Sequence, residues 1–213
     1  SLMFWQIWNV DEKEAQFPED LSPAESAPVS AKGYVIPYGD CPLDKEKIGE
    51  MVYIDILNRA NDYVFIMTPY LILDGEMESA LKFTAQRGVD VRIILPGIPD
   101  KKIPYALAKT HYKSLLSSGV KIYEYAPGFV HAKVFLSDQR EAVVGTINLD
   151  YRSLYHHFEC AAYLKDVDCL EDIRQDFQNT MRKCRMVTRE TIQREPFTVK
   201  LTGYLAKVIA PLL

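Results

Sequence analysis

Residues 131–138 read HAKVFLSD, and residues 145–148 read GTIN. Each stretch belongs to an apolar run rich in β-branched residues, VHAKVFL at 130–136 and EAVVGTI at 141–147, and the polar SDQR separates the two runs. Apolar runs of this length on either side of a short polar turn predict a β-hairpin. The hairpin is therefore expected to carry a histidine, a lysine and an asparagine at one end.

These three side chains predict the chemistry of the hairpin. Residues two apart on a strand point to the same face, so His131 and Lys133 are expected to enter one pocket together, with Asn148 facing it from the next strand. An ammonium and an amide donate hydrogen bonds to phosphate oxygens. An imidazole attacks phosphorus or carries a proton. The combination predicts a site for phosphoryl transfer.

The full pattern is His-x-Lys-x4-Asp followed by Gly-Thr-x-Asn, and it resembles the signature of the phospholipase D superfamily, with Thr146 where serine is commonest. A longer likeness, over roughly residues 33–213, is to the second half of bacterial cardiolipin synthases. The stretches that carry it are TPYLILD (68–74), RGVDVRIILPG (87–97), GVKIYEYAPGFVHAK (119–133), GTINLDYRSLYHHFE (145–159) and APLL (210–213).

This resemblance implies an enzyme that condenses two phosphatidylglycerol molecules into cardiolipin and glycerol through a phosphatidyl-histidine, without a metal ion or a nucleotide. Members of the superfamily build one active site from two copies of the motif, and this sequence holds a single copy. The other copy is expected from the first half of the same synthase, or from a second copy of this chain in a homodimer.

The resemblance also implies a set of catalytic and substrate-binding residues. The catalytic set is His131, Lys133, Asp138, Asn148 and Glu159, and the substrate-binding pair is Gly145 and Thr146. Lys133 and Asn148 would hold phosphate oxygens, Asp138 would support the site from a distance, and Glu159 would orient the imidazole of the partner motif. His131 would be the acid and base if the first-half histidine is the nucleophile, and the residues alone leave this assignment open.

The chain is expected to divide into three parts. Residues 11–30 carry six acidic and one basic side chain, a net −5, which leaves +1 for the rest of a chain of net charge −4. With three prolines and few apolar residues, 11–32 is predicted to be a linker. Residues 1–10 are interpreted as the end of a preceding half or as a packing arm, and 33–213 as the catalytic domain.

Strands and helices are expected to alternate through this domain. Besides the hairpin, strands are predicted at 33–39, 63–67, 89–95, 120–125 and 158–164, and helices at 45–60, 77–86, 103–116 and 168–183. Pro37 confines the first strand to a sheet edge. The expected fold is α/β, a phospholipase D-like mixed β-sheet flanked by helices on both faces. No apolar run of about 18 residues predicts a membrane span.

The other histidines and the cysteines are predicted to be structural. His111 begins a second His-x-Lys, but Ser118 stands where the motif needs aspartate, and the surrounding spacing indicates a helix. His156 and His157 are expected on opposite faces of a strand, and neither is predicted to be catalytic, although cardiolipin synthases often have asparagine where His157 stands. The four cysteines have no zinc-binding spacing, so they are predicted to be reduced thiols, with no metal site.

The C-terminal region is basic, with seven basic and two acidic residues from 181 to 213. Its tail, LTGYLAKVIAPLL at 201–213, is predicted to form an amphipathic helix that either rests on a bilayer rich in anionic lipid or closes the core. The expected partners are phosphatidylglycerol and an anionic membrane surface. The expected location is the cytoplasmic side of the cell membrane, with the anchoring segments of the family absent from this sequence.

Two other functions remain open from sequence. A single-motif phosphodiesterase or nuclease can complete its site as a homodimer across a twofold axis. Against this, the charge of +1 outside the acidic segment is far from the strongly basic footprint of most nucleic-acid-binding domains, and no nucleic-acid partner is expected. The third possibility is an inert half-site.

Overall fold

The computed structural model describes residues 2–17 and 31–212, and the chain divides into two units, Ser1–Lys32 and Gly33–Leu213. In the first unit the helix α1 (Leu2–Trp8) stacks Phe4 on Trp8, with ring centroids 5.6 Å apart. Most of the predicted linker, residues 18–30, lies outside the described residues. The interpretation of 1–10 as a remnant or an arm stays a prediction.

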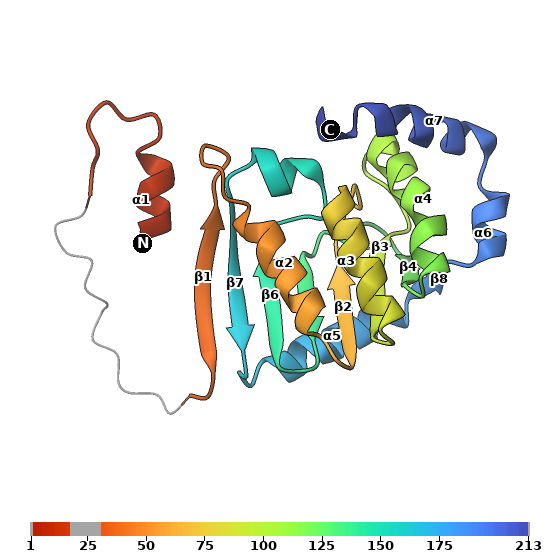
Figure 1. The fold of residues 1–213 in the computed structure, drawn as a ribbon, viewed down its shortest axis with the longest axis horizontal. Helices are drawn as coiled ribbons and strands as arrows, with labels where there is room; N and C mark the ends of the chain where they lie inside the picture. Colours follow the sequence, from red (N-terminus) through yellow and green to blue (C-terminus); the bar gives the residue numbers. More distant parts are fainter. Residues whose placement is uncertain (1, 18–30, 213) are drawn as a thin grey trace. The chain divides into compact units, whose positions relative to one another are not determined.

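The second unit is built on one mixed sheet of eight strands, in the order β1-β7-β6-β5-β2-β3-β4-β8 (Figure 1). The strands are β1 (Tyr34–Asp40), β2 (Tyr63–Met67), β3 (Asp90–Pro96), β4 (Lys121–Tyr125), β5 (Val134–Ser137), β6 (Glu141–Gly145), β7 (Glu159–Lys165) and β8 (Cys184–Met186). β2, β3 and β4 are parallel, and the remaining pairs are antiparallel. The mixed sheet, the edge position of β1 and the hairpin β5–β6 confirm the predicted architecture.

Helices cover both faces of this sheet, as predicted. The helices of this unit are α2 (Ile48–Arg59), α3 (Gly75–Gln86), α4 (Lys102–Ser117), α5 (Leu170–Met181), α6 (Arg189–Arg194) and α7 (Phe197–Val208), with a π-helical turn η1 (Arg152–His156) and a 3₁₀ turn η2 (Ala210–Leu212). On one face, Tyr53 of α2 stacks on Phe135 of β5 at 4.0 Å. On the other, Phe177 of α5 stacks on Phe65 of β2 at 4.6 Å. Figure 1 shows α2 and α3 in front of the sheet and α5 behind it.

Short-range signals set the ends of the helices. Asp74 caps α3 by accepting a hydrogen bond from the Met77 amide at 2.8 Å, so the helix begins two residues before the predicted start. Gly88 and Gly119 follow α3 and α4 with φ of +98° and +100°, a backbone conformation that other residues rarely adopt. These glycines end the two helices as the sequence predicts.

The C-terminal region contains two elements that the sequence analysis did not predict, the short strand β8 and the helix α6. α7 then packs closely on α4. Gly203 permits this approach, because a Cβ at that position would lie 2.3 Å from the Ala106 carbonyl oxygen. The opposite side of α7 exposes large apolar side chains. They are Phe197, Leu201, Tyr204, Leu205 and Val208. α7 therefore closes the core with its small residues and keeps an apolar face exposed. None of the described helices has the length and hydropathy to cross a bilayer.

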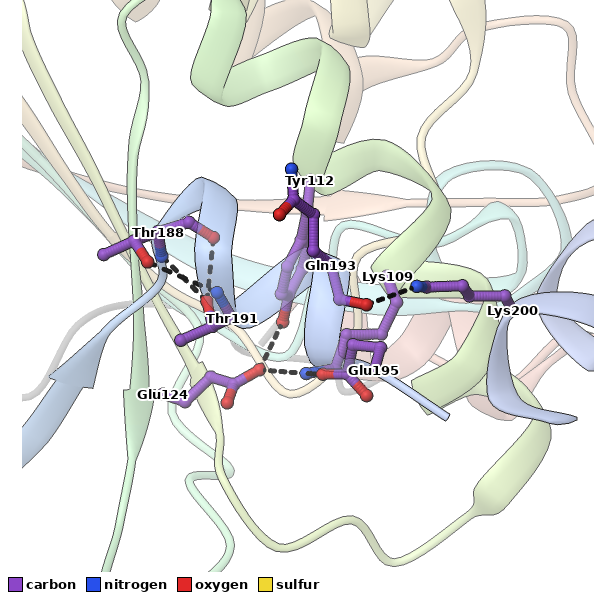
Figure 2. A network of polar contacts seen from close by, with 8 residues as sticks. All are labelled: Lys109, Tyr112, Glu124, Thr188, Thr191, Gln193, Glu195 and Lys200. Atoms are coloured by element: carbon purple, nitrogen blue, oxygen red, sulfur yellow. Dashed lines mark hydrogen bonds and ion pairs between the residues drawn. The ribbon is translucent and has the colours of Figure 1, made fainter. Parts of the chain in front are cut away.

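Polar contacts hold α6 against α4 and β4 (Figure 2). The Lys109 ammonium lies between two carboxylates, 2.5 Å from Glu124 and 2.6 Å from Glu195. The Tyr112 hydroxyl donates to Glu124 at 3.1 Å, and Lys200 at the start of α7 donates to the Gln193 carbonyl at 2.9 Å. We refer to Lys109, Tyr112, Glu124 and Glu195 as the Lys109 network.

Candidate functional site

Four of the predicted catalytic residues gather at one end of the sheet. Lys133 immediately precedes β5, Asn148 follows β6, and Glu159 begins β7. The register brings these strand ends together, because Val134 pairs with both Met67 and Val144. The predicted strand at 130–136 begins only at Val134, so His131 and Lys133 lie in the segment that enters the sheet, not on a regular strand.

His131 and Lys133 differ in exposure and in their partners. The His131 side chain is exposed and stacks on Phe129 with ring centroids 5.7 Å apart, and within residues 31–212 no hydrogen bond reaches its imidazole. Lys133 is only 8% exposed, and its ammonium donates to the His131 backbone carbonyl at 2.7 Å. Burial lowers the pKa of Lys133, and the charges of Glu159 and Asp150 oppose this effect only in part. A buried ammonium without a carboxylate in contact is prepared for an anionic ligand.

Asn148 is fixed by Asp150, a residue that the sequence analysis missed. The Asn148 amide donates to one Asp150 oxygen at 3.1 Å, and the other Asp150 oxygen accepts from the Ser153 amide at 2.8 Å. The signal was available, because aspartate is a preferred residue just before a helical turn, where its side chain accepts from a backbone amide two or three residues further on. The Leu149 amide donates to the Thr68 hydroxyl at 3.2 Å, which ties this segment to the end of β2. The side-chain oxygen of Asn148, Oδ1, is buried without a hydrogen-bond partner among the described residues.

Thr146 and Glu159 join the ends of β6 and β7. The Thr146 hydroxyl donates to the buried Glu159 carboxylate and accepts from the Cys160 amide at 3.0 Å. His157 lies 3.6 Å from the second oxygen of Glu159. A Cβ on Gly145 would lie 2.4 Å from the Cys160 carbonyl, so only glycine allows β7 to approach here. Gly145 and Thr146 thus set the local geometry, and their contact with a substrate stays a prediction.

The structure does not bring Asp138 to the other candidate residues. Asp138 occupies the β5–β6 turn at the opposite end of the hairpin, with φ of +52°. Its carboxylate accepts hydrogen bonds from the amides of Asn61, Asp62 and Tyr63 at 2.8, 3.0 and 2.8 Å. Asp138 therefore anchors the hairpin to the start of β2 and has no direct contact with the site.

The remaining histidines occupy structural positions. His111 is buried on α4, with Nδ1 2.9 Å from Glu78, and burial lowers its pKa despite the opposing effect of that carboxylate. It is the satisfied helical histidine that the sequence predicts. The prediction that His156 lies on a strand is wrong, because His156 is the last residue of the π-helical turn η1. There its Nε2 is 3.1 Å from the Pro211 carbonyl oxygen.

One group of carboxylates near the site is close enough to share an ion in the described part of the chain. Its members are Glu50, Asp74 and Glu76. The Tyr155 hydroxyl already contacts the first two, with Glu50 at 3.1 Å. Burial, and then the neighbouring Asp74, raise the pKa of Glu50 to about 7. A proton held by Glu50 would reduce the repulsion between these two carboxyl groups.

The mixed sheet, with an imidazole, a buried ammonium and an amide at one end of a central hairpin, defines a phospholipase D-like domain. Residues 53–181 match the family model described as the cardiolipin synthase, PLD-like domain. The chain belongs to this family.

Relatives match over the whole chain. A protein of Streptococcus mutans serotype c is 62% identical over 213 residues, which cover 100% of this chain and 46% of that protein. A cardiolipin synthase of Geobacillus is 33% identical over 213 residues, which cover 100% of this chain and 42% of that enzyme. The chain thus spans less than half the length of the curated relatives it matches.

Solved structures share the fold at low sequence identity. The phosphatidylserine synthase of Haemophilus influenzae superposes with a TM-score of 0.69 at 16% identity, covering 84% of this chain and 48% of that one. The phospholipase D family member Nuc of Salmonella typhimurium superposes with a TM-score of 0.62 at 16% identity, covering 73% of this chain and 99% of that one.

Proposed function

We propose that this domain supplies half of the active site of a phosphatidyltransferase that makes cardiolipin from two phosphatidylglycerol molecules. The observation that carries the proposal is that an exposed His131 imidazole, without a hydrogen-bond partner among residues 31–212, and the buried Lys133 ammonium lie at the same end of the sheet. A phosphodiester placed there would meet a group able to attack or protonate it, and a cation to bind its oxygens. Membership of the cardiolipin synthase family supports this substrate class.

The proposed reaction has two steps. In the first, one histidine attacks phosphorus and forms a P–N bond, while the bond between phosphorus and the headgroup glycerol oxygen breaks. The other histidine protonates that oxygen, and free glycerol leaves. In the second, the latter histidine removes a proton from a hydroxyl of the second phosphatidylglycerol. That oxygen bonds to phosphorus and the P–N bond breaks, which releases cardiolipin. His131 is assigned the acid and base role, and the first-half histidine the role of nucleophile.

Lys133 and Asn148 are proposed to hold the reacting phosphate. Both donors now use acceptors within the protein, the His131 carbonyl at 2.7 Å and Asp150 at 3.1 Å. A bound phosphate would offer both of them charged acceptors, and such hydrogen bonds are stronger than neutral ones. Glu159 is proposed to orient the imidazole of the partner motif, because its carboxylate is buried at the site and held in place by Thr146.

The second motif is proposed to come from the rest of a longer synthase or from a second copy of this chain. The relatives are more than twice as long as the match, which leaves room for another domain. The membrane is proposed as the other partner, at its cytoplasmic side. The exposed apolar face of α7, with Lys200 and Lys207 on the same helix, suits an anionic bilayer surface.

A second candidate is a homodimeric phosphodiesterase that cleaves nucleic acid. The observation that favours it is the match to 99% of the Nuc chain, which means that a phospholipase D family member exists at nearly the size of this domain. The near-neutral charge of the domain argues against a nucleic-acid substrate.

The test compares wild type, His131→Ala and His156→Ala on phosphatidylglycerol vesicles and on DNA, with the mass of the chain in solution measured beside each assay. His156 is a matched control because it is exposed near the site and outside the motif. Cardiolipin formation that is lost in His131→Ala and retained in His156→Ala would support the transferase. DNA cleavage with the same dependence would overturn it in favour of the phosphodiesterase. A monomer without either activity would indicate an incomplete site.

A further inference from the structure

A cavity of about 560 Å³ opens beside the candidate site. It lies between the segment after β2, the start of α4 and the start of η1, and Figure 1 shows these segments at the end of the sheet where β6 ends and β7 begins. Three cationic and three apolar or aromatic side chains in its wall carry the argument. They are Lys101, Lys102 and Arg152, and Tyr70, Ile72 and Ile103.

The cationic side of the cavity lacks acidic partners. Among residues 31–212, none of Lys101, Lys102 and Arg152 forms an ion pair, and the Lys101 ammonium lies 5.8 Å from the centre of the Tyr70 ring. Asp150 is the one carboxylate in the described wall, and both its oxygens accept hydrogen bonds, from Asn148 and from the Ser153 amide. Asp100, outside the wall residues, accepts a hydrogen bond from the Tyr70 hydroxyl at 2.6 Å, so three cations face two carboxylates. The cavity therefore has an excess of positive charge that a phosphate would neutralise.

The other side of the cavity is apolar. Ile72 is buried and Ile103 is half exposed, and both line the cavity together with Tyr70. A free phosphate or a sugar would leave these side chains without a partner. A phosphate ester that carries a hydrocarbon chain would satisfy both sides.

Two contacts connect this cavity with the residues proposed to react. Asp150 lies in the cavity wall and holds Asn148 at 3.1 Å. Tyr70 lies in the same wall and packs on Phe129 at 6.4 Å, and Phe129 stacks on His131 at 5.7 Å. A molecule in the cavity would therefore contact Asp150, which holds Asn148, and Tyr70, which packs on the aromatic neighbour of His131.

We propose that this cavity binds the phosphate and the adjoining acyl chain of a second phospholipid, the one whose glycerol hydroxyl accepts the transferred group. This assignment rests on the proposed function. The phosphate of the acceptor does not react, so a site that holds it by Lys101, Lys102 and Arg152 would place the glycerol hydroxyl toward His131 without competing for Lys133.

The test measures binding where the reacting site cannot contribute. In the His131→Ala/Lys133→Met background, calorimetry would follow dihexanoyl-phosphatidylglycerol below its micelle concentration, glycerophosphoglycerol and inorganic phosphate. Adding Lys101→Ala, Lys102→Ala and Arg152→Ala is expected to weaken binding of the short-chain lipid by about tenfold or more. The matched control removes Arg140, Lys183 and Arg185, three exposed cations remote from the cavity, and is expected to change the affinity less than about twofold.

Equal losses of lipid affinity in the two triple variants would overturn the proposal, because binding would then depend on net charge and not on the cavity. A further variant, Ile103→Asn, is expected to weaken the short-chain lipid and leave glycerophosphoglycerol unchanged. If inorganic phosphate bound as tightly as the lipid and Ile103→Asn had no effect, the lipid assignment would fall.

The outcome is separable from that of the proposed function. Cardiolipin synthesis that depends on His131 but not on the three cations would support the proposed function and contradict the proposed role of the cavity. Lipid binding through the three cations without cardiolipin synthesis would do the reverse.

Discussion

Two lysines of the domain with little exposed side chain, Lys109 and Lys133, have opposite environments. Lys109, with a side chain 9% exposed, lies between the carboxylates of Glu124 and Glu195 and near the rings of two tyrosines (Figure 2). Burial alone would lower its pKa, but the charge of Glu124 and the hydrogen bonds to both carboxylates outweigh burial and raise it. The Lys133 ammonium, in a residue 8% exposed, has the His131 backbone carbonyl as its one hydrogen-bond acceptor among residues 31–212, and burial lowers its pKa.

The difference separates a structural cation from a functional one. A buried ammonium that already has two carboxylates has its charge balanced within the fold, and it connects α4 with β4 and α6. A buried ammonium that lacks such a partner costs stability in the free protein and gains its counter-charge from a ligand. Both side chains are largely shielded from solvent, so low exposure alone does not identify the functional lysine, whereas the identity of the contacting acceptor does.

The largest expected effect is on catalysis. Lys133→Met should lower the rate of phosphodiester turnover by about 10²- to 10³-fold, the loss typical of one donor to a developing oxyanion. Its thermal stability should stay equal or rise, because no carboxylate in contact loses a partner. Lys109→Met should keep its activity per folded molecule within about twofold. Cardiolipin formation and thermal unfolding, measured on both variants, test this pair, and a stable, fully active Lys133→Met would remove the proposed distinction.

The second effect is on stability and concerns the Lys109 network. Lys109→Met leaves Glu124 and Glu195 facing each other without a cation, which should lower the free energy of unfolding by about 2 to 3 kcal/mol. Adding Glu124→Gln and Glu195→Gln to Lys109→Met removes the unpaired charges and should recover most of this loss. Urea unfolding gives both values. An equally unstable triple variant would mean that packing of the lysine stem, and not charge, is what α6 requires.

The third effect is expected at Asp138, which belongs to the motif and yet lies away from the site. Asp138→Ala leaves three backbone amides without their acceptor and should cost about 1.5 kcal/mol of unfolding free energy. Asp138→Asn keeps one acceptor oxygen and tolerates the positive φ, so it should cost less. Activity per folded molecule should change little in either variant. A fold-intact Asp138→Asn without activity would instead place this residue on the functional side of the comparison.

Much of this arrangement was predictable from sequence, because it depends on local patterns. Alternating apolar runs predicted the sheet and the hairpin, motif spacing predicted a common pocket for His131, Lys133 and Asn148, and the family resemblance added Glu159. The short elements β8 and α6 were missed because they form by pairing with distant β4 and α4, not from their own periodicity. Lys109 and Lys133 have the same side chain. Lys109 differs because its two carboxylate partners, Glu124 and Glu195, lie 15 and 86 positions away in the sequence. Such contacts depend on topology.

The same reasoning applies to a buried acid, where the expected effect is smallest. Glu50 is 1% exposed, one of its oxygens has no described partner, and burial together with Asp74 raises its pKa to about 7. The folded state therefore holds the Glu50 proton more tightly than the unfolded state. Between about pH 4.5 and 7 the unfolded chain releases this proton first, so the Glu50 contribution to stability falls as pH rises and is constant above that window.

Glu50→Gln keeps the shape of the protonated acid and removes its titration. It should match the wild type near pH 5 and exceed it by about 1 kcal/mol at pH 8, after allowance for screening by solvent. Urea unfolding at the two pH values measures the difference, with Glu76→Gln, an exposed neighbour, as the control. A Glu50→Gln variant that is less stable at both pH values would show that the carboxylate already has its counter-charge within the fold. Glu50 would then belong with Lys109 among the balanced groups, and not with Lys133.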